Sequence, residues 1–85
     1  MKIKIKLRLY ATLQKYLPPG SSQSETSLEL PEAASITDVL NSLSVPINQA
    51  HIVFINGRHV LRPDISTRQL QDGDILGVFP AIGGG

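Results

Sequence analysis

The first ten residues alternate between basic and aliphatic side chains, and this pattern constrains the fold more than any other part of the sequence. The odd-numbered positions from 3 to 9 are Ile3, Ile5, Leu7 and Leu9, and the even-numbered positions from 2 to 10 are Lys2, Lys4, Lys6, Arg8 and Tyr10. Successive side chains of a β-strand point to opposite faces of a sheet. The alternation therefore predicts a strand over residues 2–10 with one buried face and one solvated face.

Residues 35–44 carry the pattern of an amphipathic helix that can cover the buried face. The apolar residues Ile36, Val39, Leu40 and Leu43 follow the spacing i, i+3, i+4, i+7. Ser35 is a favourable N-cap, and Asp38 three residues later gives a weaker form of the capping box. We expect this helix to end near Ser44, before Val45-Pro46, and to be the main element packed across the sheet.

The remaining segments complete a layered α+β arrangement. In chain order we expect one or two helical turns over 11–17, a strand over 26–30, a central strand buried on both sides over 51–55, a return strand over 58–61, a loop over 63–70 and a last strand over 75–79. Asn56-Gly57 is a strong hairpin signal, and Ile65 and Leu70 are expected to plug the core. This order predicts a mixed sheet of four to five strands with one main helix, and the last strand beside the first.

Composition limits the classes of function that the chain can have. Its 85 residues, 41% hydrophobic and 18% charged, suit one folded domain over residues 1–85. The net charge is +1, there are no cysteines, and no apolar run approaches the roughly 20 residues of a membrane span. We therefore expect a cytoplasmic protein, monomeric when free, that binds neither nucleic acid nor a membrane.

The chain carries little that points to catalysis of its own. His51 and His59 flank the predicted hairpin, but two histidines without further ligands make a weak zinc site, so we expect no metal. Asp72-Gly73-Asp74 lacks the longer ligand series of a calcium loop and is expected to be a turn. No nucleotide-binding loop or nucleophile elbow is present in the sequence.

The last residues are chemically distinctive. Pro80 ends the last strand, and residues 80–85 are expected to form a flexible tail ending in Gly83, Gly84 and Gly85. A frayed terminus or a linker has the same composition. Composition alone slightly favours the interpretation that these residues are a frayed terminus or a linker. A free carboxylate on Gly85 could instead attack the α-phosphate of ATP and form an acyl-adenylate. Glycines would let such a tail thread a narrow tunnel, because a Cβ would collide with the walls.

The sequence resembles the MoaD/ThiS family of ubiquitin-like sulfur carriers, over nearly its whole length. The motif is Leu70-x-Asp72-Gly73-Asp74, an apolar strand, and then Phe79-Pro80-Ala81-Ile82-Gly83-Gly84-Gly85. Members similar to the molybdopterin synthase small subunit (MoaD) have Phe-Pro-Pro-Val-x-Gly-Gly there. Ala81 and Ile82 depart from that pattern but keep the spacing to the terminus. The resemblance implies the ubiquitin-like β-grasp fold.

The resemblance also implies a protein co-substrate, with no bound cofactor. An ATP-dependent, ubiquitin-activating-like adenylyltransferase of the MoeB/ThiF type would adenylate Gly85, and a sulfur donor would convert it to a thiocarboxylate. The large subunit of molybdopterin synthase (MoaE type) would then transfer the sulfur for the molybdenum or tungsten cofactor. Gly83 and Gly84 would thread into these enzymes.

A docking surface is expected beside the tail. By the period of two, Phe79 lies on the solvated face with Tyr10 if Leu76 and Val78 are buried. The resemblance adds Pro80, Ile82 and His59 to this partner-binding region. Three alternatives stay open: a carrier for the thiamine thiazole or another sulfur-containing metabolite, a ubiquitin-like modifier conjugated through Gly85, and an RNA-binding module that uses the basic strand.

Overall fold

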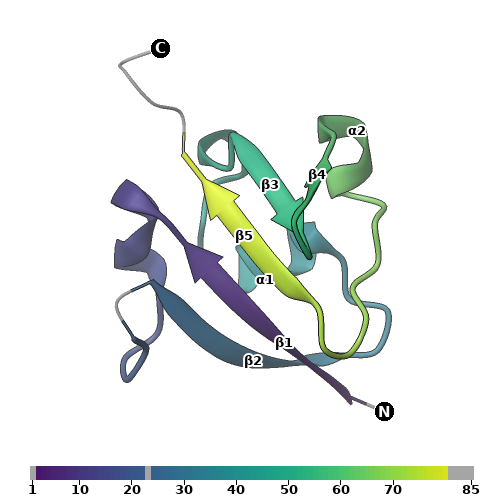
Figure 1. The fold of residues 1–85 in the computed structure, drawn as a ribbon, viewed down its shortest axis with the longest axis horizontal. Coiled ribbons are helices and arrows are strands. Elements are labelled where there is room, and N and C mark those ends of the chain that lie inside the picture. The colour runs from purple at the N-terminus through teal and green to yellow at the C-terminus, as the bar shows by residue number, and fades with distance from the viewer. Residues whose placement is uncertain (1, 23, 81–85) are drawn as a thin grey trace.

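The computed structural model describes residues 2–22 and 24–80, and over these ranges it contains one mixed sheet of five strands (Figure 1). The strands are β1 (Lys2–Leu9), β2 (Glu25–Pro31), β3 (Ile52–Ile55), β4 (Arg58–Val60) and β5 (Ile75–Phe79), in the spatial order β2-β1-β5-β3-β4. The only parallel pairing among these strands joins β1 to β5; the other neighbours are antiparallel. The expected mixed sheet, with the last strand beside the first, is confirmed.

The alternation of β1 translates directly into burial. Its aliphatic residues all lie in the core, and its lysines are exposed, with Arg8 half-buried. Tyr10 follows the strand in an extended conformation, and its backbone N–H donates to the carbonyl oxygen of Val78 at 3.2 Å. The first strand therefore ends one residue earlier than expected, but Tyr10 remains aligned with β5.

The helix α1 (Ile36–Ser42) begins as the sequence predicts. The backbone N–H of Asp38 donates to Ser35 Oγ at 3.1 Å, and the backbone N–H of Ser35 donates to Asp38 Oδ2 at 2.9 Å, so the capping box is complete. Ile36, Val39 and Leu40 are buried in the same cluster as the inner residues of β1. Each such side chain stabilises the fold by roughly 1.5–3 kcal/mol before entropy is subtracted.

The helix ends two residues before the expected position. Leu43 is the C-cap, and Ser44 takes a positive φ of 62°, which is incompatible with continuing the helix. The backbone N–H of Val45 then donates to the carbonyl oxygen of Leu40 at 2.8 Å. The chain thus leaves the helix through a left-handed residue before it reaches Pro46.

Short helical segments occupy three connections. The 3₁₀ helix η1 (Ala11–Tyr16) matches the expected helical turn after β1, and a second 3₁₀ helix, η2 (Ile47–Gln49), follows α1. The helix α2 (Arg62–Ile65) was expected to be a loop; Pro63 lies in its first turn, where a missing N–H costs nothing. Ile65 and Leu70 are buried, as predicted.

The Asn56-Gly57 hairpin is confirmed, and it is tied to the turn before β5. Both residues have positive φ values, 53° and 83°, which a two-residue type I′ turn requires. Asn56 Nδ2 donates to Asp74 Oδ1 at 2.9 Å, and Asn56 Oδ1 accepts from the backbone N–H of Ile75 at 2.9 Å. The buried Asp74 also accepts from the backbone N–H of Gln71 at 2.8 Å. These bonds fix the start of β5 against the end of β3.

The prediction of a central strand buried on both sides over residues 51–55 is wrong. β3 lies fourth in the strand order and β5 is central. Only Val53 and Ile55 are buried, whereas Ile52 and Phe54 are half-buried. The reason is that the core cluster, which contains Val53, Ile55 and the inner residues of α1, lies on one side of the sheet. We call the opposite side the open face.

The open face also carries ion pairs between β1 and β2. Arg8 Nε donates to Glu25 Oε1 at 2.7 Å, and Lys2 Nζ lies 3.7 Å from Glu29 Oε1. The hydrogen bond from Arg8 lowers the pKa of the Glu25 carboxyl, and the same bond raises the pKa of the Arg8 guanidinium. The ion pair of Arg8 is the less exposed of the two, with side chains 43% and 33% exposed.

We expect Val39→Ala to lower the free energy of unfolding by about 1–3 kcal/mol, because it leaves a cavity at a fully buried site on α1. Urea denaturation followed by circular dichroism measures the change. Asn41→Ala, at an exposed position of the same helix, is the control and should change stability by less than about 0.5 kcal/mol. Equal effects of the two substitutions would contradict the assignment of the buried face.

The Arg8–Glu25 pair predicts a pH dependence with a defined sign. Because the pKa of Glu25 is lower in the folded than in the unfolded state, its carboxylate stabilises the fold above the ordinary carboxyl pKa, and this contribution is lost as the pH falls through the lowered value. Glu25→Gln should therefore lower the melting temperature slightly at neutral pH and leave it unchanged at a pH of about 2. Glu29→Gln, in the more exposed pair, should show the smaller effect at neutral pH. A difference for Glu25→Gln that persists in acid would refute the role of its charge.

Candidate functional site

Four ring side chains form a continuous row across the open face, which we call the aromatic row: Tyr10, Phe79, Phe54 and His59. The rings of Tyr10 and Phe79 are stacked, with centroids 4.2 Å apart and planes 5° apart. Phe54 meets Phe79 edge to face at 6.0 Å, and His59 is tilted against Phe54 at 5.5 Å. These rings connect the end of β1, β5, β3 and β4 in that order.

The strand register explains this gathering. Phe79 lies opposite Ile52, and Phe54 lies between Gly77 on β5 and His59 on β4. Residues that face each other across neighbouring strands have Cβ atoms about 5 Å apart, so ring side chains on one face come into contact. Each aromatic pair stabilises the fold by about 0.5–1.5 kcal/mol, in addition to the effect of the area that its rings bury.

A hollow of about 290 Å³ lies within this row, above Gly77. Its lining consists of Arg8, Tyr10, Phe54, Gly57, Ile75, Gly77 and Phe79. Three of these seven residues are aromatic, three belong to β5, and Arg8 is the one charged residue among them. A concave surface with apolar walls and one charged group is typical of a binding site.

The structure brings together three of the predicted partner-binding residues. Tyr10 and Phe79 lie on the same face, as predicted, although both are half-buried because they stack on each other. His59 is exposed and joins them only through Phe54. Their roles in binding a partner stay predictions.

The predictions made for Pro80 and for the residues after it have different outcomes. Pro80 was assigned to the flexible tail and to the partner-binding surface, but it is buried at the end of β5. Ile82, Gly83, Gly84 and Gly85 lie outside the described residues. The position of the tail's origin is nevertheless fixed, because Phe79 belongs to the central strand.

Phe54 is the residue that sequence reasoning missed. The run from His51 to Ile55 was interpreted as buried on both sides, which hid the period of two in it. Val53 and Ile55 alternate with Ile52 and Phe54, as the residues of β1 do. The signal was therefore present, but β-branched residues at both parities weakened it.

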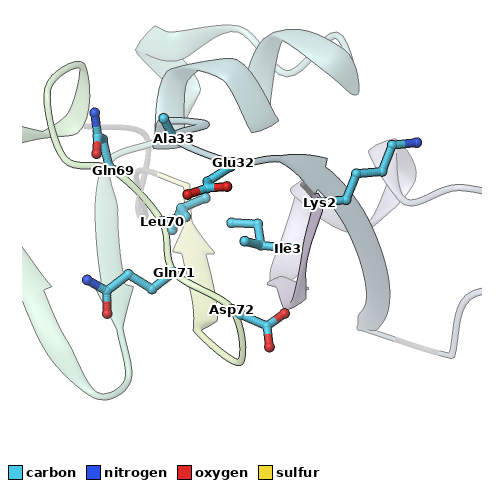
Figure 2. A pocket seen from close by; sticks show the side chains of 8 residues that line it. All are labelled: Lys2, Ile3, Glu32, Ala33, Gln69, Leu70, Gln71 and Asp72. Carbon is cyan, nitrogen blue, oxygen red and sulfur yellow. The ribbon is translucent and has the colours of Figure 1, made fainter.

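Another hollow, with a volume of about 550 Å³, lies at the opposite end of β1 (Figure 2). Ile3 and Leu70 lie at its centre, and the polar side chains of Gln69, Gln71 and Asp72 stand around them. Asp72 Oδ1 already accepts a hydrogen bond from the backbone N–H of Lys4 at 2.7 Å. This hollow is remote from Phe79 and is not assigned to the site.

Two features are absent from the described part of the chain, residues 2–22 and 24–80. No group of three or more histidine, cysteine, aspartate or glutamate side chains is placed to hold a metal ion in this part of the chain. None of the helices described there has the length and apolarity needed to cross a membrane.

Comparison with solved structures supports the fold. The HVO 2177 protein of Haloferax volcanii is 28% identical, with a TM-score of 0.77 over 99% of this chain and 88% of that one. A Pyrococcus furiosus protein assigned as molybdopterin converting factor subunit 1 is 24% identical (TM-score 0.66, covering 94% and 99%). Small archaeal modifier protein 1 of Methanosarcina acetivorans is 21% identical (TM-score 0.66, covering 100% and 99%). At these last two identities the likeness shows the fold alone.

Sequence comparison identifies the family. None of the curated proteins is similar enough in sequence to count as a match. The family model described as Mut7-C ubiquitin matches residues 2–83, nearly the whole chain. The expected resemblance to ubiquitin-like carriers of the MoaD/ThiS type is confirmed, and nothing singles out the molybdopterin branch. The chain therefore belongs to the Mut7-C ubiquitin family and has the ubiquitin-like β-grasp fold.

Proposed function

We propose that the chain is a sulfur carrier whose C-terminal Gly85 is adenylated, converted to a thiocarboxylate and used as a sulfur donor. The observation that carries this proposal is the aromatic row, which reaches the end of β5 at Phe79, where the tail begins. A protein bound to this row lies beside the end of β5. The chain would then act as a protein co-substrate, and ATP would be consumed by a ubiquitin-activating-like adenylyltransferase.

The energetics support a docking surface next to the reacting group. Ordering each tail residue in an enzyme tunnel costs roughly 1–2 kcal/mol. Aromatic side chains such as Tyr10, Phe54 and Phe79 are enriched among residues that dominate binding energy at protein interfaces. Docking at this row offsets the cost of ordering the tail. The enclosed tunnel then protects the acyl-adenylate from water, which would hydrolyse it.

The favoured acceptor pathway is molybdopterin synthesis, for the molybdenum or tungsten cofactor, with a MoaE-type large subunit as partner. Two features support it: the Phe79-Pro80 start of the tail motif, and a fold neighbour assigned as molybdopterin converting factor subunit 1. The activating enzyme would be of the MoeB/ThiF type. The proposal places the chain in the cytoplasm, with the free form monomeric.

Protein modification is the second candidate. The same fold occurs in small archaeal modifier protein 1 of Methanosarcina acetivorans. An adenylated Gly85 could equally acylate a lysine amine on a target protein. Sulfur transfer to thiazole would use the same activated terminus. The carrier chemistry is common to these functions, and the enzyme that receives the activated chain decides among them.

RNA binding at the open face is disfavoured by the ring geometry. Single-stranded nucleic acids stack their bases on exposed aromatic faces. Tyr10 and Phe79 instead turn one ring face each toward the other, and Phe79 also contacts Phe54 edge to face. With a net charge of +1, the chain lacks a strong field to attract phosphates.

Mass spectrometry tests the carrier proposal. After incubation with ATP, a MoeB/ThiF-type adenylyltransferase and a sulfur donor, the intact chain should gain the mass difference between one sulfur and one oxygen atom. A known carrier processed in parallel is the control. An unchanged mass, with the control converted, would refute sulfur carriage; covalent ladders in cell extract that require Gly85 would favour protein modification.

Deletion of Gly85 should abolish adenylation, because the reacting carboxylate moves to a different position in the active site. Its melting temperature should stay unchanged, since the core cluster lies between Ile3 and Val78. Pyrophosphate release on mixing with the adenylyltransferase and ATP measures the reaction. Full activity of the deleted chain would contradict a role for this terminus.

Phe79→Ala should weaken partner binding at least tenfold and leave the chain folded, because Phe79 is half-buried on the open face and outside the core cluster. Titration calorimetry with the adenylyltransferase measures the affinity. Ile47→Ala, an exposed aliphatic residue (44%) on η2, is the matched control and should bind normally. Unfolding of the Phe79 variant would show that this ring belongs to the core.

A further inference from the structure

The strand β2 forms an edge of the sheet that the aromatic row does not reach. It stands first in the strand order, and β1 is its only strand partner among the described residues (Figure 1). With seven residues, β2 is longer than β4, the three-residue strand at the other edge. A long open edge is a template for a further strand, and natural sheets usually shorten or protect such edges. The edge of β2 is therefore a candidate surface for a partner.

The register shows which backbone groups of β2 point away from β1. In an antiparallel pair, hydrogen-bonded and non-hydrogen-bonded positions alternate along both strands. The backbone N–H of Leu9 donates to the carbonyl oxygen of Ser24 at 2.9 Å, so the even-numbered residues of β2 bond to β1. The odd-numbered residues point outward. Glu25 agrees with this, because its carbonyl oxygen accepts from the N–H of Ser22 in the preceding loop at 3.0 Å.

Two outward residues in the middle of β2 are available for another strand. At the end of β2, Pro31 has no N–H, and its carbonyl oxygen accepts from the N–H of Ala34 at 3.2 Å. Ser27 and Glu29 are exposed, and within the described chain no residue beyond β2 is bonded to their outward N–H and C=O groups. A strand added here would form backbone hydrogen bonds to both residues.

A hollow of about 340 Å³ lies beside the end of this edge, between β2 and α1. Its lining consists of Leu30, Pro31, Glu32, Ala33, Ala34, Asp38 and Ser42. Every second side chain of an added strand would point to the helix side of the sheet, where Leu28 and Leu30 pack. A residue opposite Leu30 would therefore place its side chain beside the hollow.

The helix side of this edge is acidic. From residue 16 to residue 57 the chain has no lysine or arginine, and its charged residues there are Glu25, Glu29, Glu32 and Asp38. On the open face, β1 balances the two glutamates of β2, since Arg8 is bonded to Glu25 and Lys2 lies 3.7 Å from Glu29. The residues that line the hollow include two acidic ones and no basic one. A cationic side chain is therefore the complement of the hollow.

The geometry points to the edge of β2 as a site that binds an extended, basic protein segment, which adds to the sheet antiparallel to β2 and places one arginine in the hollow. The aliphatic stem of the arginine packs on Leu30 and Ala34, and its guanidinium lies toward the carboxylate of Asp38. That carboxylate keeps its charge in the capping box, because its partner is the neutral backbone N–H of Ser35. Main-chain bonds supply affinity in such a strand addition, and the pocket supplies specificity.

This binding mode goes beyond the proposed function and does not depend on it. The strand β1 separates β2 from β5, so a segment added at the edge leaves the aromatic row and the end of β5 uncovered. The chain could therefore hold this partner while another protein acts at the opposite surface.

Charge favours a basic segment over a second copy of the chain or a nucleic acid. A two-fold symmetric pairing of β2 with β2 of another copy would bring two identical acidic flanks together. The phosphates of a nucleic acid would meet the carboxylates of Glu32 and Asp38 at the hollow. Both occupants are tested below.

A peptide titration tests the proposal. The probe is the acetylated and amidated peptide Thr-Arg-Lys-Val-Thr, added to the isotope-labelled full chain while backbone amide resonances are recorded. In the proposed register its arginine lies opposite Leu30, its lysine opposite Glu29 and its valine opposite Leu28. We expect saturable shifts centred on Ser27, Glu29 and Asp38. The peptide Thr-Glu-Glu-Val-Thr, of opposite charge, should not bind.

Two N-methylated peptides separate strand addition from simple charge attraction. N-methylation of the lysine removes the N–H that would donate to Glu29, and it should weaken binding about fivefold, because one backbone hydrogen bond is lost. N-methylation of the valine is the matched control, since its N–H would point away from β2, and this peptide should bind like the unmodified one. Equal binding of the two peptides would overturn the proposed strand addition.

Variants of the chain test the edge and the hollow separately. Ser27→Pro removes one outward N–H at an edge position that tolerates proline, and it should weaken binding about fivefold in the folded chain. Asp38→Asn keeps an oxygen for the capping box but removes the charge, and it should weaken binding about threefold. Asp64→Asn, at an exposed position of α2, is the matched control and should bind normally.

Three further results would overturn the proposal: no shifts along β2, full binding by the Asp38→Asn chain, or the same shifts caused by an oligouridine probe or by raising the chain's own concentration. The sulfur-transfer assay is independent of these outcomes. A chain that is thiocarboxylated but does not bind the peptide refutes only the strand addition. A chain that binds the peptide but is never thiocarboxylated refutes only the carrier function.

Discussion

The hydrophobic core lies on one side of the sheet, and the rest of the structure depends on this asymmetry. Among the described residues, nineteen apolar ones form a single buried cluster, to which α1 contributes Ile36, Val39 and Leu40. Every strand of such a sheet must divide its side chains between a dry and a wet face. The half-buried rings of Tyr10, Phe54 and Phe79 lie on the wet side as a consequence, and they shield one another from water.

The parallel pairing of β1 and β5 places the ends of both strands at the same edge of the sheet. Because β5 is inserted between β1 and β3, the last described strand is supported on both edges. Its start is held by the bonds of Asp74 to Asn56 and Gln71, and its end carries Phe79. The tail therefore originates from the most constrained strand of the sheet, close to the proposed docking surface.

Because the core and the open face lie on opposite sides of the sheet, the residues that determine stability differ from those that form the proposed binding surface. Substitutions in the core cluster act on the free energy of unfolding, whereas substitutions at Gly77 or Phe79 alter a surface that lies outside that cluster. Under the proposed function, the chain would engage an activating enzyme and then a different acceptor, and this arrangement would suit both. The surface can be adapted to the charge and shape of its partners while the packing beneath it is unchanged.

Local patterns in the sequence determined most of the elements. The alternation of β1, the capping box of Ser35 and Asp38, and the Asn56-Gly57 turn each depend on residues within a few positions of one another, so their physics can be evaluated from the chain alone. The length of the last strand and the side on which Phe79 lies were predicted for the same reason. The tail motif likewise indicated the carrier family.

Only the tertiary structure decided which distant residues become neighbours. Phe54, Gly77 and Tyr10 come from three separate segments, and they line one hollow because of the strand order and register, which arise from long-range pairing. The half-exposure of Phe54 follows from the position of the core on one side of the sheet, a property that the apolar run of β3 did not reveal. The hollow above Gly77 exists for the same reason: a missing side chain creates a binding surface only when neighbouring strands place larger residues around it.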